Sequence, residues 1–171
     1  AATGPFYCPL DGNVYIDVGF FDELQRLGGE GDFAGAYVIA HEVGHHVQNL
    51  LGTSSRVQQA QRAARSRADA NALSVLLELQ ADCYAGVWAS HANEREQRAS
   101  GVPLLDDGAH EEGLETAAAI GDDRLMRQAG RAARPESFTH GSSEQRAYWL
   151  ATGFRTGEIG ACDTFAAASG G

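Results

Sequence analysis

The chain has 171 residues, of which 43% are hydrophobic, and a formal net charge of −10. This length fits one domain, so we expect a single unit that spans residues 1–171. The negative charge argues against a nucleic-acid partner, because the phosphate backbone would be repelled. No apolar run approaches the roughly 20 residues needed to cross a bilayer, so we expect no membrane segment in this chain.

The predicted elements begin with a β-hairpin at about residues 5–18, where alternating segments flank an Asp11-Gly12 turn. Apolar residues at helical spacing then predict helices at residues 20–27, about 33–51, 54–66, about 69–97, 111–128 with a break at Gly121, and a last helix at 142–156. We expect an exposed loop at 130–139 and a flexible tail at 166–171. The predicted fold class is therefore α+β and predominantly helical, with a small N-terminal hairpin.

The segment 41–45, His-Glu-Val-Gly-His, lies within the predicted helix at 33–51. Histidines four residues apart share one face of a helix and can bind one metal ion together. Glu42 directly follows the first histidine, so its carboxylate lies beside the metal, where it can take a proton from water that the metal activates. The pattern predicts a zinc site for peptide-bond hydrolysis, with His41 and His45 as ligands and Glu42 as the base.

A catalytic zinc needs a third protein ligand and keeps its fourth position open. A histidine ligand six residues after the motif is excluded, because Leu51 stands there. In the next predicted helix, Glu78 and Asp82 are four residues apart and share a face. We therefore expect Glu78 to be the third ligand of one Zn²⁺ ion. We expect Asp82 to lie behind it and to accept a hydrogen bond from His41 or His45.

The face that carries Glu78 and Asp82 is otherwise made of small residues, at positions 81, 85, 86 and 89. Small side chains let another helix backbone come close, which a short bond from glutamate to the metal requires. The opposite side is expected to supply bulky side chains to the core: Leu73, Leu76, Leu77, Tyr84, Val87 and Trp88. A polar stripe that faces solvent is the alternative for the two carboxylates.

Amide hydrolysis builds an oxyanion, so we expect a hydrogen-bond donor near the open metal position. His140 is the candidate, because it lies in a loop just before a helix N-terminus. Simple solvent exposure is the alternative for this histidine. Arg146 and Tyr148, on the helix that follows, are weaker candidates for the same role.

Other polar residues have a structural interpretation as well as a functional one. Asp122 and Asp123 could orient a histidine ligand, but we favour a structural role such as the capping of a helix. His46 points about 100° away from His45 on the helix, so we do not expect it to bind the metal. A cluster of arginines is interpreted as a solvated helix face: Arg56, Arg62, Arg65 and Arg67.

The three cysteines are Cys8, Cys83 and Cys162. An odd number allows at most one intramolecular disulfide and leaves one thiol over. A bridge such as Cys83 to Cys162 would tie the C-terminal tail to the second ligand helix in an extracytoplasmic protein, whereas a cytosolic protein would keep all three reduced. The sequence leaves both possibilities open.

Several segments, in order, resemble the landmarks of the bacterial family called putative neutral zinc metallopeptidases. They are GPFYCP at 4–9, VYID at 14–17, HEVGHHVQ at 41–48, ELQADC at 78–83, AIGDD at 119–123, THGSS with QR at 139–146, and CDTF at 162–165. The resemblance implies a zincin-like fold with a glutamate as third ligand, and it supports His140, whose loop is among the landmarks. Family members often carry an N-terminal membrane anchor and a further cysteine outside the stretch seen here. We expect an extracytoplasmic location and leave a cytoplasmic one open.

Together, these residues predict a zinc-dependent peptidase, most simply an endopeptidase, that acts on peptides or proteins. One zinc ion is expected, with Glu42 and His140 as the catalytic groups. Two alternatives stay open. One is a zinc-stabilised peptide-binding or regulatory domain without hydrolysis, in which the fourth metal position would be closed. The other is a zinc amidase or deformylase with a narrow pocket.

Overall fold

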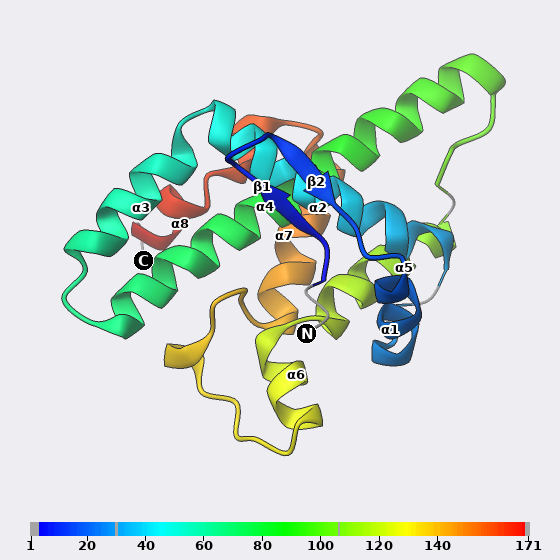
Figure 1. The fold of residues 1–171 in the computed structure, drawn as a ribbon. Helices are drawn as coiled ribbons and strands as arrows, with labels where there is room; N and C mark the ends of the chain where they lie inside the picture. The colour runs from blue at the N-terminus through cyan, green and yellow to red at the C-terminus, as the bar shows by residue number, and fades with distance from the viewer. Residues whose placement is uncertain (1–3, 30, 106, 170–171) are drawn as a thin grey trace.

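The computed structural model describes residues 4–29, 31–105 and 107–169, and this part of the chain is predominantly helical (Figure 1). Two antiparallel strands, β1 (Phe6–Cys8) and β2 (Asn13–Tyr15), precede the helices. The helices are α1 (Gly19–Leu27), α2 (Asp32–Leu50), α3 (Thr53–Ala63), α4 (Arg67–Ser100), α5 (Asp107–Ala119), α6 (Asp122–Gln128), α7 (Ser143–Thr156) and α8 (Thr164–Ser169), with short 3₁₀ helices η1 (Pro135–Ser137) and η2 (Ile159–Cys162). The predicted mostly helical fold with an N-terminal hairpin is confirmed. None of the described helices is long and apolar enough to span a bilayer.

The helix boundaries follow the predictions closely, and the break at Gly121 separates α5 from α6. Two predictions are wrong. The loop at 130–139 is not wholly exposed, because it contains η1 and the buried side chain of Phe138. The helix predicted at 142–156 is not the last one, because η2 and α8 follow it. The flexibility expected for the tail stays a prediction, and residues 170 and 171 lie outside the described part of the chain.

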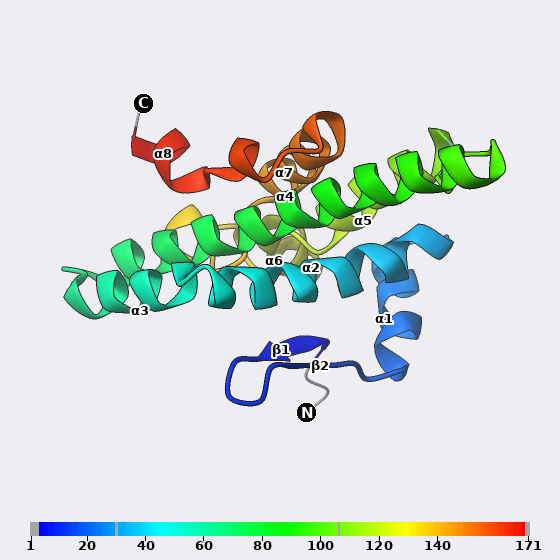
Figure 2. The same ribbon diagram turned by 90° about the horizontal axis from the view of Figure 1, so that it is seen from above.

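The long helix α4 lies between α2 on one side and α7 on the other (Figure 2). The hairpin packs against the far side of α2, so that hairpin, α2, α4 and α7 follow one another across the molecule in this view. Helices α3 and α8 also pack on α4, and α5 packs on α2 and α7. The main buried cluster lies among α1, α2, α4, α5 and α7, and it includes Leu24, Phe33, Tyr37, Val38, Ala85, Ala89, Ala117 and Leu150.

The small residues of α4 allow close helix contacts on two sides. A Cβ atom on Gly44 of α2 would lie 3.0 Å from the carbonyl oxygen of Ala81 in α4. On the other side, a Cβ atom on Gly86 of α4 would lie only 2.2 Å from the carbonyl oxygen of Leu150 in α7. The close backbone approach that the small face of α4 predicted is therefore confirmed.

The bulky side of α4 fills the core only in part. Tyr84 and Val87 are buried, but Trp88 is 44% exposed, so the prediction is wrong for that residue. Trp88 instead lines an apolar groove of about 450 Å³ together with Ile39 and Val43 of α2. It lies at the rim of the contact between α2 and α4 rather than inside it.

Candidate metal centre

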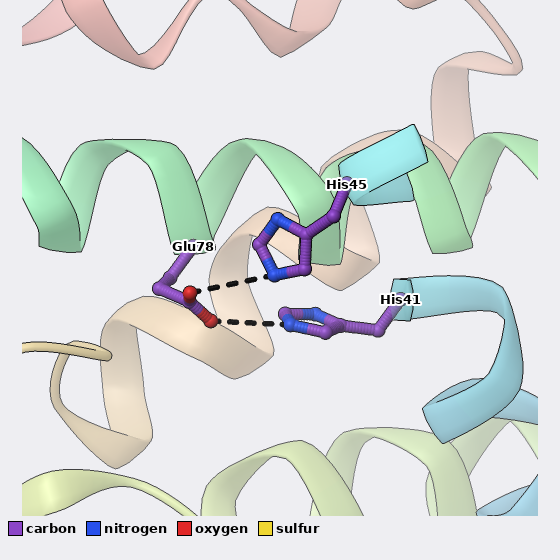
Figure 3. Close-up of side chains that lie close together, drawn as sticks. All are labelled: His41, His45 and Glu78. Carbon is purple, nitrogen blue, oxygen red and sulfur yellow. Dashed lines mark hydrogen bonds and ion pairs between the residues drawn. The ribbon is translucent and has the colours of Figure 1, made fainter. Parts of the chain in front are cut away.

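Three side chains from two helices meet beside the hairpin. His41 and His45 project from successive turns of α2, and Glu78 projects toward them from α4 (Figure 3). The Nε2 atom of His41 lies 3.1 Å from Oε2 of Glu78, and Nε2 of His45 lies 3.4 Å from Oε1 of the same carboxylate. One donor atom from each residue lies within 4.8 Å of the other two.

This set of donor atoms fits a zinc ion. Two imidazole nitrogens and one carboxylate oxygen are typical of catalytic zinc sites that keep a fourth position for water or substrate. Tetrahedral bonds of about 2.0–2.2 Å place neighbouring ligand atoms about 3.4 Å apart. The two separations of 3.1 and 3.4 Å are close to that value. The structure therefore brings the three predicted ligands together at a spacing that one metal ion can bridge.

His41 is held from behind by a buried ionic network. Its Nδ1 atom lies 2.7 Å from Oδ1 of Asp82 and donates to it, because a carboxylate only accepts. Asp82 is fully buried and accepts two hydrogen bonds from the guanidinium of Arg146, each 2.9 Å long. The buried hydroxyl of Tyr37 donates to Asp82 over 2.6 Å. Asp82 thus lies where the sequence placed it, behind a histidine of the motif, and that histidine is His41.

The charges of this network determine its protonation. Burial raises the pKa of Asp82, but Arg146 and His41 outweigh burial and bring the pKa down to about 2. Burial lowers the pKa of His41, whereas Asp82 and Glu78 raise it to about 10. For Glu78, burial raises the pKa, yet hydrogen bonds from both histidines hold it well below its usual value. Both carboxylates are therefore ionised at neutral pH, which favours a bound cation.

The support of His45 comes from Gln48, one turn further along α2. Nδ1 of His45 lies 2.9 Å from Oε1 of Gln48. The Gln48 amide nitrogen donates to the carbonyl oxygen of Leu77 over 2.7 Å and to Oε1 of Gln80 over 3.1 Å. The sequence prediction missed this role. The spacing of three residues between His45 and Gln48 on the ligand helix is the signal that could have found it.

Glu42 lies beside the three predicted ligands and next to the hairpin. Its Oε2 atom accepts a hydrogen bond of 2.8 Å from the backbone N–H of Tyr7 in β1. Glu42 is only 8% exposed, and burial raises the pKa of its carboxyl group although His41 and His45 oppose the change. A carboxylate with a raised pKa beside a metal site is suited to accept a proton from water.

The same tyrosine fastens the hairpin to α2. The hydroxyl group of Tyr7 lies 3.0 Å from Nδ1 of His46 and accepts a hydrogen bond of 3.1 Å from the side chain of Asn49. His46 therefore points to the hairpin. Among the described residues it lies outside the cluster of ligand donors, and that it does not bind the metal stays a prediction.

His140 lines the same cleft, and Asp122 holds its loop. Oδ2 of Asp122 accepts hydrogen bonds from three successive backbone N–H groups, at residues 139–141. Oδ1 of Asp122 lies 3.2 Å from Nδ1 of His140, and this contact raises the pKa of the imidazole although burial opposes it. Asp122 thus orients His140 rather than a predicted ligand. Asp123 has a structural role, because its Oδ1 atom accepts hydrogen bonds from the backbone N–H and the hydroxyl group of Ser143 at the start of α7.

The predicted ligands and catalytic residues line one cleft of about 620 Å³. Its walls come from the N-terminal strand, α1, α2, α4 and the residues around α6 and α7: Phe6, Tyr7, Phe20, Leu27, Val38, His41, Glu42, His45, Glu78, Ile120, Leu125, His140 and Arg146 among others. Arg146 is part of the wall, but its guanidinium bonds to Asp82 and Tyr37. Tyr148 is 58% exposed and is not among the described residues that line the cleft. The geometry therefore favours His140 over both alternatives.

A disulfide joins Cys83 and Cys162. Cys83 directly follows Asp82, so the bridge anchors the segment before α8 to the helix that carries Glu78 and Asp82. Cys8, in β1, is a half-buried free thiol. The sequence left open whether Cys83 and Cys162 form a disulfide or stay reduced, and in the structure they form the disulfide.

Comparison with known proteins assigns a family. The family model described as putative neutral zinc metallopeptidase matches residues 1–165. The chain belongs to this family. It is 53% identical over 163 residues to the protein YpfJ of Escherichia coli K12, which covers 95% of the chain and 54% of that relative. It is 49% identical over 172 residues to the protein Rv2575 of Mycobacterium tuberculosis, covering 97% of the chain and 56% of the relative.

Both relatives are described as uncharacterized proteins. The chain spans about half the length of each. No solved structure matches the chain, so the zincin-like fold that the resemblance implied stays a prediction, whereas the family itself is confirmed.

Proposed function

We propose that the chain is a zinc-dependent endopeptidase. The observation that carries the proposal is the convergence of His41, His45 and Glu78 beside the carboxylate of Glu42 in one open cleft. The family description, which names a zinc metallopeptidase, supports the same conclusion.

His41, His45 and Glu78 would hold one zinc ion. When bound, zinc supplies Lewis acidity, which polarises a carbonyl group and acidifies water. Glu42 takes the proton of the attacking water and later passes it to the leaving amine. The N–H group of Tyr7 donates to Oε2 of Glu42 and so holds this carboxylate in place beside the three predicted ligands.

His140 would donate a hydrogen bond to the oxyanion that forms on the substrate carbonyl. The Asp122 carboxylate can only accept, so it favours a hydrogen on Nδ1 of His140, and the hydroxyl oxygen of Thr139, 3.1 Å from the same nitrogen, can accept as well. Nε2 can then donate only while the ring is protonated. The pKa of His140 is raised, first by the hydrogen bond to Asp122, which favours that protonated form.

The shape of the cleft supports a peptide or protein substrate. A volume of about 620 Å³ lies in the range of ligand sites and leaves room for a few residues of an extended chain. Apolar side chains from α1, α2 and α6 line part of the cleft and could receive apolar substrate side chains: Phe20, Leu27, Val38 and Leu125. We further propose an extracytoplasmic location, which the Cys83–Cys162 disulfide supports because such bonds persist mainly in oxidising compartments.

The experiment that tests this function is a zinc assay combined with cleavage of an unbiased peptide library. We expect one zinc ion per chain and cleavage of internal peptide bonds, lost on chelation and restored by added zinc. Tight zinc binding without any cleavage would support a peptide-binding domain instead. Cleavage of formyl or side-chain amides alone would support an amidase or deformylase. A chain that binds no zinc would contradict all three.

A further inference from the structure

The His45 side of the site continues into a row of amide groups that the proposed mechanism does not use. From His45 the contacts run through Gln48 and Gln80 to the carbonyl oxygen of Cys162, over 2.9, 3.1 and 2.9 Å. Gln48 is completely buried and Gln80 is 7% exposed. Building on the proposed zinc site, we infer that this amide relay sets the tautomer and ring orientation of His45, with Gln48 and Gln80 as positioning residues.

Two backbone carbonyl groups decide how both side-chain amides are turned. The Cys162 carbonyl can only accept, so the Gln80 atom 2.9 Å away is the amide nitrogen, and Oε1 of Gln80 faces Gln48. The Leu77 carbonyl can also only accept, so the Gln48 atom 2.7 Å from it is nitrogen. Gln48 must therefore turn its Oε1 atom to His45. Flipping the Gln48 amide would place its oxygen against two other oxygens.

This orientation decides the state of His45. An oxygen acceptor 2.9 Å from Nδ1 requires a hydrogen on that nitrogen, whichever charge the ring carries. Nε2, which lies 3.4 Å from Glu78, is then the atom available to the metal. The relay thus does with neutral groups what a carboxylate usually does behind a metal-bound histidine.

The far end of the amide relay is firmly anchored. Cys162 is covalently bonded to Cys83 of α4. Two residues further on, the buried hydroxyl group of Thr164 donates to the carbonyl oxygen of Leu76, also in α4, over 2.7 Å. Both anchors lie within one turn of Gln80. They hold the Cys162 carbonyl in place and so connect the C-terminal segment to the orientation of His45.

A purely structural tie between α2 and α4 is the alternative role for the two glutamines. Gln61 provides a matched control, because its amide nitrogen ties α3 to α4 in the same way. It donates to the carbonyl oxygen of Ala70 over 3.2 Å and to the hydroxyl group of Ser74 over 2.7 Å. Gln61 is not among the described residues that line the cleft.

The first test is NMR of the imidazole nitrogens in the zinc-loaded chain. We expect Nδ1–H signals protected from solvent exchange for both His41 and His45. In Gln48→Met the His45 signal should lose its protection, while that of His41, which Asp82 holds, should keep it. An unprotonated Nδ1 on His45 in the unsubstituted chain overturns the inference. The same test can be made on the zinc-free chain, because the contact between Gln48 and Nδ1 of His45 does not involve the metal. Failure to bind zinc would therefore contradict the proposed function, but it would not decide the role of the amide relay.

The second test is zinc affinity, measured by competition with a chromophoric chelator. Gln48→Met should weaken zinc binding about 10- to 100-fold, and Gln80→Met by a smaller factor, because Gln48 keeps its contact with Leu77. Gln61→Met should lower stability and leave zinc affinity unchanged. Equal losses in all three variants, or unchanged affinity in Gln48→Met, overturn the inference. If Gln48→Met does not fold, Gln80→Met against Gln61→Met decides between the same two outcomes.

Discussion

His41 and His45 lie one turn apart on α2, but their Nδ1 atoms contact partners of different charge. Behind His41 is the carboxylate of Asp82, paired with the guanidinium of Arg146. Behind His45 is the uncharged amide of Gln48. One predicted ligand therefore has an ionic support and the other a neutral one, within a single metal site.

The difference reflects what packs on the far side of α4. Helix α7 comes close to α4 at Gly153 and brings the cation Arg146 with it, so a buried carboxylate at Asp82 has its countercharge. Near Gln80, the neighbouring segment offers the carbonyl oxygen of Cys162. An amide is the matching donor for a carbonyl group, and no charge needs to be buried. Each support suits the groups that its neighbouring element provides.

The largest expected effect concerns the ionic support. Arg146→Met removes the guanidinium that pairs with the buried Asp82 carboxylate and leaves His41 as its remaining cationic partner. Breaking a buried pair in this way costs about 3–5 kcal/mol, so the free energy of unfolding in urea should fall by that amount. Arg155, at an exposed position of the same helix, is the control. Arg155→Met should change the free energy of unfolding by less than about 0.5 kcal/mol. Equal losses in the two variants would contradict the ionic support.

A somewhat smaller loss is expected when the anchor of the neutral support is removed. Replacing Cys83 and Cys162 by alanine opens a bridge between positions 79 residues apart, which should lower the free energy of unfolding by about 2–4 kcal/mol. Zinc affinity should fall less than in Gln48→Met, because Thr164 still ties the segment to α4. If zinc affinity falls as far, the bridge rather than the amide relay positions His45.

The two supports should also differ in how stability depends on pH in the zinc-free chain. Although burial lowers the pKa of His41, Asp82 and Glu78 raise it from 6.5 to about 10. Its contribution is therefore fully present below pH 6.5 and is lost as the pH rises through 10. The pKa of Asp82 falls from 3.8 to about 2, so its contribution is present above pH 3.8 and is lost as the pH falls through 2.

Urea unfolding across this pH range checks the expectation. Asp82→Asn should weaken the pH dependence of the free energy of unfolding, because it removes the titrating group Asp82 and the larger of the two causes that raise the pKa of His41. Gln48→Met should leave that dependence unchanged, since the amide relay has no ionisable group beyond His45. A similar flattening in both variants would remove the distinction between the supports.

The smallest expected effect concerns another pair of carboxylate and imidazole, Asp122 with the half-exposed His140. Asp122→Asn weakens the hydrogen bond and removes the charge through which Asp122 raises the pKa of His140, and leaves the smaller contribution of Glu78. If the protonated ring donates to the oxyanion, activity falls as the pH rises through that pKa, so the basic limb of kcat/KM should move to lower pH. Asp123→Asn is the matched control, because Asp123 contacts Ser143 and Arg127 instead. An unmoved limb in Asp122→Asn would argue against His140 in this role.

The features that the sequence predicted are those that depend on spacing within one element. The i,i+4 pairs His41 with His45 and Glu78 with Asp82 share a face on any regular helix. The Asp11-Gly12 turn likewise predicts its own hairpin. The small residues of α4 correctly indicated a close helix contact, because their size acts whichever helix approaches.

The partners that the sequence could not predict come from distant parts of the chain. Arg146 lies 64 residues from Asp82, and Cys162 lies 82 residues from Gln80, so no local spacing indicates either contact. Arg146 was expected at most as a donor to substrate, whereas its guanidinium bonds to Asp82. The exposure of Trp88 was missed for a related reason. How far α2 covers this side chain depends on the packing of the two helices, and the sequence pattern of α4 does not indicate it.

The proposal of peptide hydrolysis is tested most directly by Glu42→Gln. The glutamine oxygen can still accept the hydrogen bond from the N–H group of Tyr7, so the hairpin should keep its place, but the amide cannot take a proton from water. We predict unchanged zinc content and loss of peptide-library cleavage by about 10²-fold or more. Cleavage at the rate of the unsubstituted chain, with zinc still bound, would contradict the assignment of Glu42 as the base.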